Sequence, residues 1–174
     1  MFLFCKVAWQ KKPIFLTPEK VLQKLEKYCA YQERSQLEVE KKCREYGMTQ
    51  EETGLILVEL IQSNFINEER FAFAYVKGKF NQKNWGPKKI EIGLIQAGVS
   101  RYLIDKALSN IPKSNQENTI EKLALKKIKS WGYSTEESLK NISKILSFTD
   151  RQKLIKFLYQ KGYNFEDINK VIGG

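Results

Sequence analysis

The sequence predicts an all-α fold: three tandem three-helix repeats that form an elongated, curved array. Three stretches of the chain align on a glycine, an amphipathic helix precedes each stretch, and strand signals are weak outside residues 2–15. A unit of about 50 residues buries little apolar core by itself, so neighbouring repeats are expected to stack. The expected segments are an N-terminal extension at 1–16, with a short strand or no fixed structure, and repeats at 17–66, 67–112 and 113–174.

The repeats align on Gly47, Gly98 and Gly162. Twelve positions before each glycine lies a residue of a type that is accepted at a helix N-cap. Those residues are Ser35, Gly86 and Asp150. Apolar residues eight and four positions before each glycine place one apolar stripe along a helix of about three turns. Because glycine suits the left-handed position that ends a helix, a break is predicted at all three glycines.

Two further helices complete each predicted repeat. A capped helix follows each glycine, with N-caps at Thr49, Ser100 and Asn164. Thr49 and Glu52 have the spacing of a capping box. Amphipathic helices precede the aligned stretches, at about 18–31, 68–80 and 117–130.

Two features of the pattern differ between repeats. The helix over 49–62 is apolar almost all round, so it is predicted to be the most buried helix of its repeat. Gly47 and Gly98 are 51 positions apart, whereas Gly98 and Gly162 are 64 apart. This difference predicts a longer connection or an added helical turn between Trp131 and Thr149.

The composition excludes several classes of protein. The chain has no histidine, and Cys5, Cys29 and Cys43 lack C-x-x-C spacing, so a zinc site or a Ser-His-Asp arrangement is not expected. It also has no Walker-type phosphate loop, and we therefore expect no enzymatic activity and no cofactor. No stretch approaches the roughly 20 apolar residues of a membrane span. We expect a cytoplasmic monomer, with Cys29 and Cys43 reduced and packed as small apolar residues.

The charge pattern indicates an anionic partner. The net charge is +10, and residues 67–112 and 113–174 carry +4 and +5, whereas residues 17–66 carry −2. Such an excess is typical of proteins that bind nucleic acid, although lysines also serve simply to keep a helical array soluble. The candidate binding residues, here called the basic ridge, are Lys77, Lys79, Lys83, Lys88, Lys89, Arg151, Lys153 and Lys156.

Part of the basic ridge lies at a predicted helix start. Pro87 suits the first position of a helix, so Lys88 and Lys89 fall in the first turn, where each cation opposes the helix dipole by about 0.3–1 kcal/mol. Arg151 and Lys153 repeat this pattern in the third repeat. Such a start is expected to hold a phosphate or a carboxylate. If the repeats stack in register, the two starts face the same side and join both clusters into one stripe.

Trp85 precedes the Gly86-Pro87 start and has two interpretations. It is a candidate anchor for a partner protein or a nucleobase. It is equally well placed to pack on the core as a hydrophobic staple at the helix entry.

Several short motifs follow one another along the chain. They are Glu33-Arg34-Ser35 with Gln36-Leu37-Glu38-Val39, then Asn67-Glu68-Glu69-Arg70-Phe71-Ala72, Trp85-Gly86-Pro87-Lys88-Lys89-Ile90 and Gly98-Val99-Ser100. In order and spacing these motifs resemble those of the RecX family. The resemblance spans residues 17–173, and the W-G-P-x-x-I piece joined to a preceding R-F-A helix is its most specific part. Its family-motif positions are Arg34, Ser35, Arg70, Phe71, Gly86, Pro87 and Gly98.

This resemblance implies a regulatory protein that binds the RecA nucleoprotein filament, lying in its helical groove. It implies that the protein limits filament growth and inhibits the ATPase and recombinase activities of RecA in DNA recombination, repair and the SOS response. The resemblance also implies DNA contact.

Two other functions remain open from the residues alone. One is a DNA-binding helical-repeat protein that acts without RecA, on single- or double-stranded DNA. Few side chains are placed to form hydrogen bonds with base edges, so such binding is expected to be nonspecific. The other is a structural adaptor without nucleic acid, which the charge of +10 disfavours.

Overall fold

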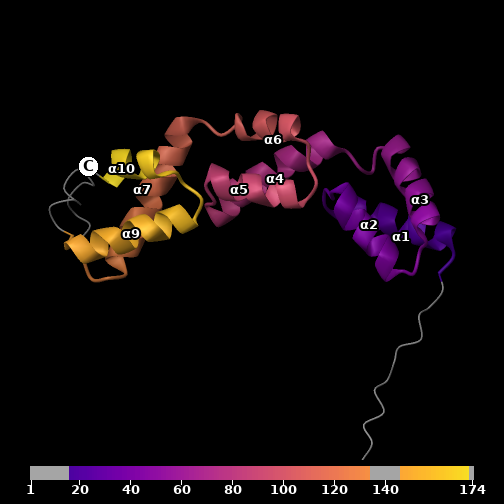
Figure 1. Ribbon diagram of the computed structural model, residues 1–174, viewed down its shortest axis with the longest axis horizontal. Coiled ribbons are helices and arrows are strands. Elements are labelled where there is room, and N and C mark those ends of the chain that lie inside the picture. The colour runs from indigo at the N-terminus through magenta and orange to yellow at the C-terminus, as the bar shows by residue number, and fades with distance from the viewer. Residues whose placement is uncertain (1–15, 134–145, 173–174) are drawn as a thin grey trace, which may run out of the picture. The chain divides into compact units, whose positions relative to one another are not determined.

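Residues 16–133 and 146–172 are the part of the chain that the computed structural model describes (Figure 1). In these ranges the regular structure is entirely α-helical, as predicted. The helices are α1 (Pro18–Tyr31), α2 (Gln36–Glu45), α3 (Gln50–Gln62), α4 (Glu68–Lys83), α5 (Pro87–Gln96), α6 (Arg101–Leu108), α7 (Lys113–Lys129), α9 (Phe148–Gln160) and α10 (Phe165–Ile172). The chain forms two compact units, Met1–Ile66 and Asn67–Gly174.

Three hydrophobic cores lie within these units, and each draws on three helices. The first core packs α1, α2 and α3, the second α4, α5 and α6, and the third α7, α9 and α10. Their central side chains include Leu25 and Leu60 in the first core, Ile90 and Leu94 in the second, and Leu154, Leu158 and Ile168 in the third. The three-helix repeat is therefore confirmed, whereas the segment end points at 16, 66 and 112 stay a prediction.

The glycine breaks are confirmed by the backbone. Gly47, Gly98 and Gly162 have φ values of 81°, 79° and 97°. After each one, the next residue donates its backbone N–H to the carbonyl five positions back, as in a Schellman motif. Gly132, at φ 90°, ends α7 in the same way, which the repeat alignment did not predict.

The predicted capping box of Thr49 and Glu52 is confirmed, and Ser35 forms another. The predicted N-cap at Asp150 is wrong, because α9 begins at Phe148 and its N-cap is Ser147, whose hydroxyl accepts the Asp150 N–H at 3.1 Å. Asp150 instead pairs with Lys153 at 2.9 Å. Because the helix begins earlier than the repeat spacing indicated, Lys153 lies in the second turn of α9, where it does not oppose the dipole.

The burial predicted for α3 is also wrong. Only Thr53, Ile56 and Leu60 of this helix are buried, while Leu55 and Val58 are 69% and 52% exposed. The helix packs on α1 and α2 along one face, and among the described residues of this unit no fourth helix covers the opposite face.

Other predictions concern the cysteines, the membrane and the segments beyond the described ranges. Cys29 and Cys43 are buried as predicted, and burial raises the pKa of the Cys29 thiol to about 11. None of the helices in the described ranges has both the length and the apolar character of a membrane span. The N-terminal extension up to residue 15, with Cys5, and residues 134–145 of the added segment lie outside the described residues.

Candidate functional site

The end of α9 meets the start of α5 inside the second unit (Figure 1). The N–H of Gly86 donates to the Lys161 carbonyl at 2.7 Å, and the N–H of Lys88 donates to the Gly162 carbonyl at 3.1 Å. Pro87 has no N–H, so carbonyls at the end of α9 take the donors that a helix start leaves free. The prediction that these backbone donors hold a phosphate or a carboxylate is therefore wrong. We call this contact the inter-repeat joint.

Two glycines allow the backbones to approach at the inter-repeat joint. A Cβ at Gly86 would lie 2.4 Å from the carbonyl carbon of Gly162. A Cβ at Gly162 would lie 2.4 Å from the Cβ of Lys89. Gly86 has an ordinary φ of −78°, so the close approach explains this glycine. Tyr163 adds a hydrogen bond from its hydroxyl to the Asn84 carbonyl at 3.3 Å, and burial raises the pKa of that hydroxyl.

The joint also explains why a lysine is tolerated at the start of α5. The Nζ of Lys89 donates to the Gln160 carbonyl at 3.4 Å, at the end of α9. A cation is favourable at the negative end of one helix dipole and unfavourable at the positive end of the other. Because the two ends adjoin, the opposing effects on Lys89 offset each other, and the sequence did not show this compensation.

Trp85 packs at the entry of α5. Its ring is half-buried against the second core, which contains Ile90, as expected of a hydrophobic staple. Two ammonium groups lie over the ring: Lys89 Nζ is 4.7 Å and Lys79 Nζ 5.1 Å from its centre. Lys79 is also 4.9 Å from the ring of Tyr75. The arrangement joins core packing with cation–π contacts, and the role of Trp85 as a partner anchor stays a prediction.

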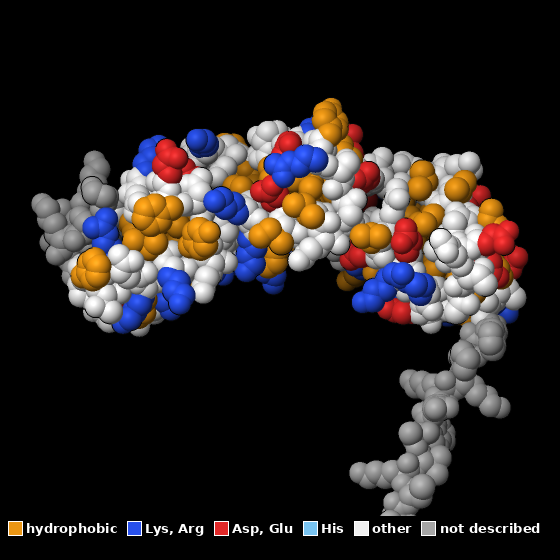
Figure 2. Space-filling view, in the orientation of Figure 1, with side chains coloured by type: hydrophobic (Ala, Val, Ile, Leu, Met, Phe, Trp, Pro, Cys, Tyr) orange, Lys and Arg blue, Asp and Glu red, His pale blue; other side chains and the backbone are white. Residues whose placement is uncertain are grey.

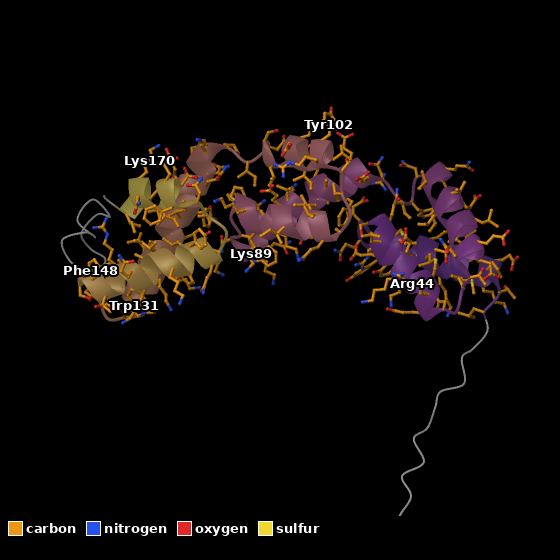
Figure 3. The ribbon with its side chains drawn as sticks, in the orientation of Figure 1. Arg44, Lys89, Tyr102, Trp131, Phe148 and Lys170 are labelled. Carbon is orange, nitrogen blue, oxygen red and sulfur yellow. The ribbon has the colours of Figure 1, made fainter. Side chains whose placement is uncertain are left out.

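Much of the basic ridge lies along the line from α9 through the joint to α5. Lys83 ends α4, Lys88 lies in the first turn of α5, and Lys156 lies on α9; all three are exposed. Within the described residues, none of these three lysines forms an ion pair. Figure 2 shows basic side chains along the edge beneath α5 and α9, and Figure 3 labels Lys89 on that edge.

The two clusters of the ridge follow one another end to end. In-register stacking would bring the starts of α5 and α9 together. Instead, the end of α9 lies against the start of α5. The starts are thus separated by the length of α9, about 20 Å at 1.5 Å per residue. Lys156 lies about one turn from the joint, and the half-buried Arg151 lies near the far end of α9.

Lys77 does not join the rest of the basic ridge. Lys77 and Lys79 are two positions apart on α4, a rotation of about 200° around the helix axis, so their side chains leave nearly opposite faces of the helix. Lys79 faces Trp85, whereas Lys77 lines a groove of about 540 Å³ between α4 and the α6–α7 connection. The structure therefore divides the predicted ridge between two faces of α4.

Two lysines that contact the Phe157 ring of α9 were not among the predicted residues. Lys161 contributes its carbonyl to the joint, and its Nζ is 5.7 Å from the ring centre of Phe157. Lys127 lies over both Phe157 and Trp131, at 5.4 Å and 5.5 Å. A signal was present for Lys161, since residues 151–165 contain four basic and no acidic residues.

The remaining family-motif positions have structural roles. Arg34 stacks on the Tyr28 ring at 3.9 Å and Ser35 caps α2. The N–H of Arg70 donates to the side chain of the α4 N-cap at 2.8 Å, and Phe71 is buried in the second core. No cluster of metal-binding side chains occurs among the residues that the structure describes.

Comparison with known proteins identifies two of the repeats. Residues 67–108 match the family model for the second three-helix domain of RecX, and residues 115–172 match that for the third. The regulatory protein RecX of Clostridium perfringens (strain SM101 / Type A) is 30% identical over 139 residues, which are 80% of this chain and 60% of the relative. That of Clostridium botulinum (strain Alaska E43 / Type E3) is 29% identical over 167 residues, 96% of this chain and 72% of the relative.

Solved structures show the same fold. The crystal structure of RecX from Lactobacillus salivarius is 26% identical with a TM-score of 0.70, covering 89% of this chain and 94% of that one. A crystal structure of a regulatory protein RecX is 25% identical with a TM-score of 0.71, covering 89% of this chain and 70% of that one. The chain spans about three fifths of the C. perfringens relatives' length. Motifs, repeats and fold agree: this chain belongs to the RecX family.

Proposed function

We propose that this protein binds the RecA nucleoprotein filament in the cytoplasm and limits its growth, lowering the ATPase and recombinase activities of RecA. The observation that carries the proposal is membership of a family whose relatives are regulatory proteins, together with a cationic edge that contains a hydrogen-bonded joint between two repeats. The protein acts by binding as a monomer. Purified protein is expected neither to hydrolyse ATP nor to cleave DNA.

The basic ridge supplies the electrostatic part of this binding. Exposed ammonium groups such as Lys83, Lys88 and Lys156 face phosphates of the filament's DNA or acidic side chains of its protein surface. Charge complementarity of this kind speeds association and fixes orientation. The inter-repeat joint holds the α5 and α9 lysines at a fixed spacing, which lowers the ordering cost of binding.

The test is RecA ATPase on single-stranded DNA with the double variant Lys88→Ala/Lys89→Ala. Two lost contacts of about 0.7 kcal/mol each raise the concentration needed for half inhibition roughly tenfold. The matched control is Lys122→Ala/Lys126→Ala, which removes the same charge from exposed positions of α7. The control is expected to inhibit like the wild type.

Folding of the double variant is expected to be almost unchanged. Replacing Lys89 by alanine keeps the Cβ, which faces Gly162. The lost hydrogen bond to the Gln160 carbonyl is offset because the unfavourable interaction of the ammonium group with the α5 dipole is also removed. Circular dichroism checks this. If the folded double variant inhibits RecA at wild-type concentrations, the ridge is only a solvated face and the site assignment is wrong.

A second candidate function is nonspecific DNA binding without RecA. Trp85 beneath two lysines favours it, because aromatic rings and cations together bind single strands without sequence preference. Titration of labelled DNA without RecA separates the two functions. Inhibition of RecA at concentrations far below those needed to bind free DNA supports direct contact with the filament.

A further inference from the structure

A groove of about 540 Å³ lies between α4 and the α6–α7 connection, all within the second unit. Its walls are mainly carbon, with Phe73, Val76 and Phe80 from α4 facing Ile111 and Pro112 from the connection. Grooves of this size accommodate one or two large side chains. The second core is complete without an occupant, since Val76, Phe80 and Ile111 are already packed in it.

The rim of the groove has one sign of charge. Arg70 and Lys77 line it, together with amide side chains, and the lining contains no aspartate or glutamate. Lys77 is exposed and, within the described residues, forms no ion pair. An apolar groove beside a cation favours a ligand that combines an apolar group with a negative charge.

Apart from Lys77, the groove is separate from the basic ridge. Arg70, Lys77 and Asn81 follow the spacing of one helical face, and Lys79 with Trp85 lies about 200° around α4 from Lys77. A ligand in the groove therefore leaves the rest of the ridge, on α5 and α9, uncovered. The apolar walls also disfavour nucleic acid, whose binding needs a cationic track for successive phosphates.

We propose that this groove is a second interaction surface, which binds an acidic segment of a partner protein. One aromatic or aliphatic side chain of that segment inserts between α4 and the α6–α7 connection. A neighbouring carboxylate pairs with Lys77. The interaction goes beyond the filament binding proposed above and does not depend on it.

Three labelled peptides test the chemistry of the groove by fluorescence anisotropy. The first is Asp-Asp-Leu-Phe-Asp-Asp, the second replaces each Asp by Lys, and the third replaces Leu-Phe by Ser-Ser. The first is expected to bind about tenfold or more tightly than either of the others, because only it supplies both burial and charge. Equal binding by the lysine peptide or the serine peptide contradicts the proposal.

Two variants place the binding in the groove. Ala74→Trp fills the groove from an exposed position of α4, and Lys77→Glu reverses the charge of the residue that pairs with the carboxylate. Both variants are expected to lower the affinity for the acidic peptide about tenfold. The matched control is Lys122→Glu, the same charge reversal on α7 outside the groove, which is expected to leave the affinity unchanged.

The two variants keep the test decisive. Circular dichroism establishes that each is folded, and if Ala74→Trp is not, Lys77→Glu alone carries the test. Unchanged peptide affinity in a folded groove variant overturns the proposal. Displacement of the peptide by a thymidine oligonucleotide from wild type, but not from Lys88→Ala/Lys89→Ala, also overturns it, because the peptide would then lie on the ridge.

Discussion

At the scale of single residues, glycine serves two different purposes in this chain. Gly98 is required by its backbone, since its φ of 79° lies in the left-handed region that disfavours a side chain. Gly86 is required by its neighbour, since its φ is ordinary but a Cβ would overlap the backbone of Gly162. The first purpose is local and could be predicted from helix-stop spacing. The second depends on a residue 76 positions away and could not.

Gly98→Val is expected to destabilise the protein by about 1–2 kcal/mol, the cost of a left-handed conformation for a residue with a Cβ. The control is Gly78→Ala within α4, where an added Cβ meets nothing within 4 Å. That change is expected to stabilise by about 0.5–1 kcal/mol, because glycine is a poor helix former. Urea unfolding measures both, and shifts of the same sign for the two variants contradict the assignment.

At the scale of helices, prediction from the sequence succeeded where the signals are local. The first helix was predicted with its observed bounds, 18–31, and the Thr49 capping box fixed the start of α3. The start of α9 was misplaced because the alignment assumed equal spacing in every repeat. Ser147, which caps it, lies just outside the aligned stretch. The exposure of Leu55 on α3 depends on which helices surround it, which an apolar pattern does not determine.

Gly86→Ala tests the inter-repeat joint. A Cβ 2.4 Å from the carbonyl carbon of Gly162 forces the two backbones apart, so the hydrogen bond from the Lys88 N–H to the Gly162 carbonyl is lost. Hydrogen exchange of the Lys88 amide is expected to accelerate about tenfold or more, because exchange reports local opening. The Asp167 amide, which donates to the Asn164 side chain at 2.7 Å, serves as the internal control.

Three outcomes of the Gly86→Ala experiment are distinguishable. Faster exchange at Lys88 with an unchanged Asp167 amide locates the damage at the joint, as expected. Equal acceleration at both amides indicates general destabilisation of the unit. Unchanged exchange at Lys88 contradicts the role given to Gly86.

At the scale of the whole molecule, charge and family membership were accessible from the sequence, but the arrangement of the charges was not. The five lysines between Lys77 and Lys89 form one run in the sequence, yet the helix turns Lys77 to the groove and Lys79 to Trp85. Lys161 was identified as part of the candidate site only from its backbone hydrogen bond at the joint. Periodicity places residues on a helix, whereas packing decides which helix ends meet. The curvature of the array stays a prediction.

The net charge of +10 and the small number of base-reading side chains lead to the last prediction, on free DNA. If about four ridge lysines each neutralise one phosphate, duplex affinity falls roughly 100-fold between about 50 mM and 200 mM salt. Lys88→Ala/Lys89→Ala removes two of these contacts, so the slope of log affinity against log salt is expected to fall by about half. Lys77→Glu is the informative comparison, because Lys77 faces the groove and its change should leave the slope nearly intact. Anisotropy titrations of two unrelated duplexes over this salt range measure the affinity and its salt dependence for the wild type and both variants. Tight binding that survives high salt, or a strong preference for one duplex, would show that contacts other than those of the ridge hold the DNA.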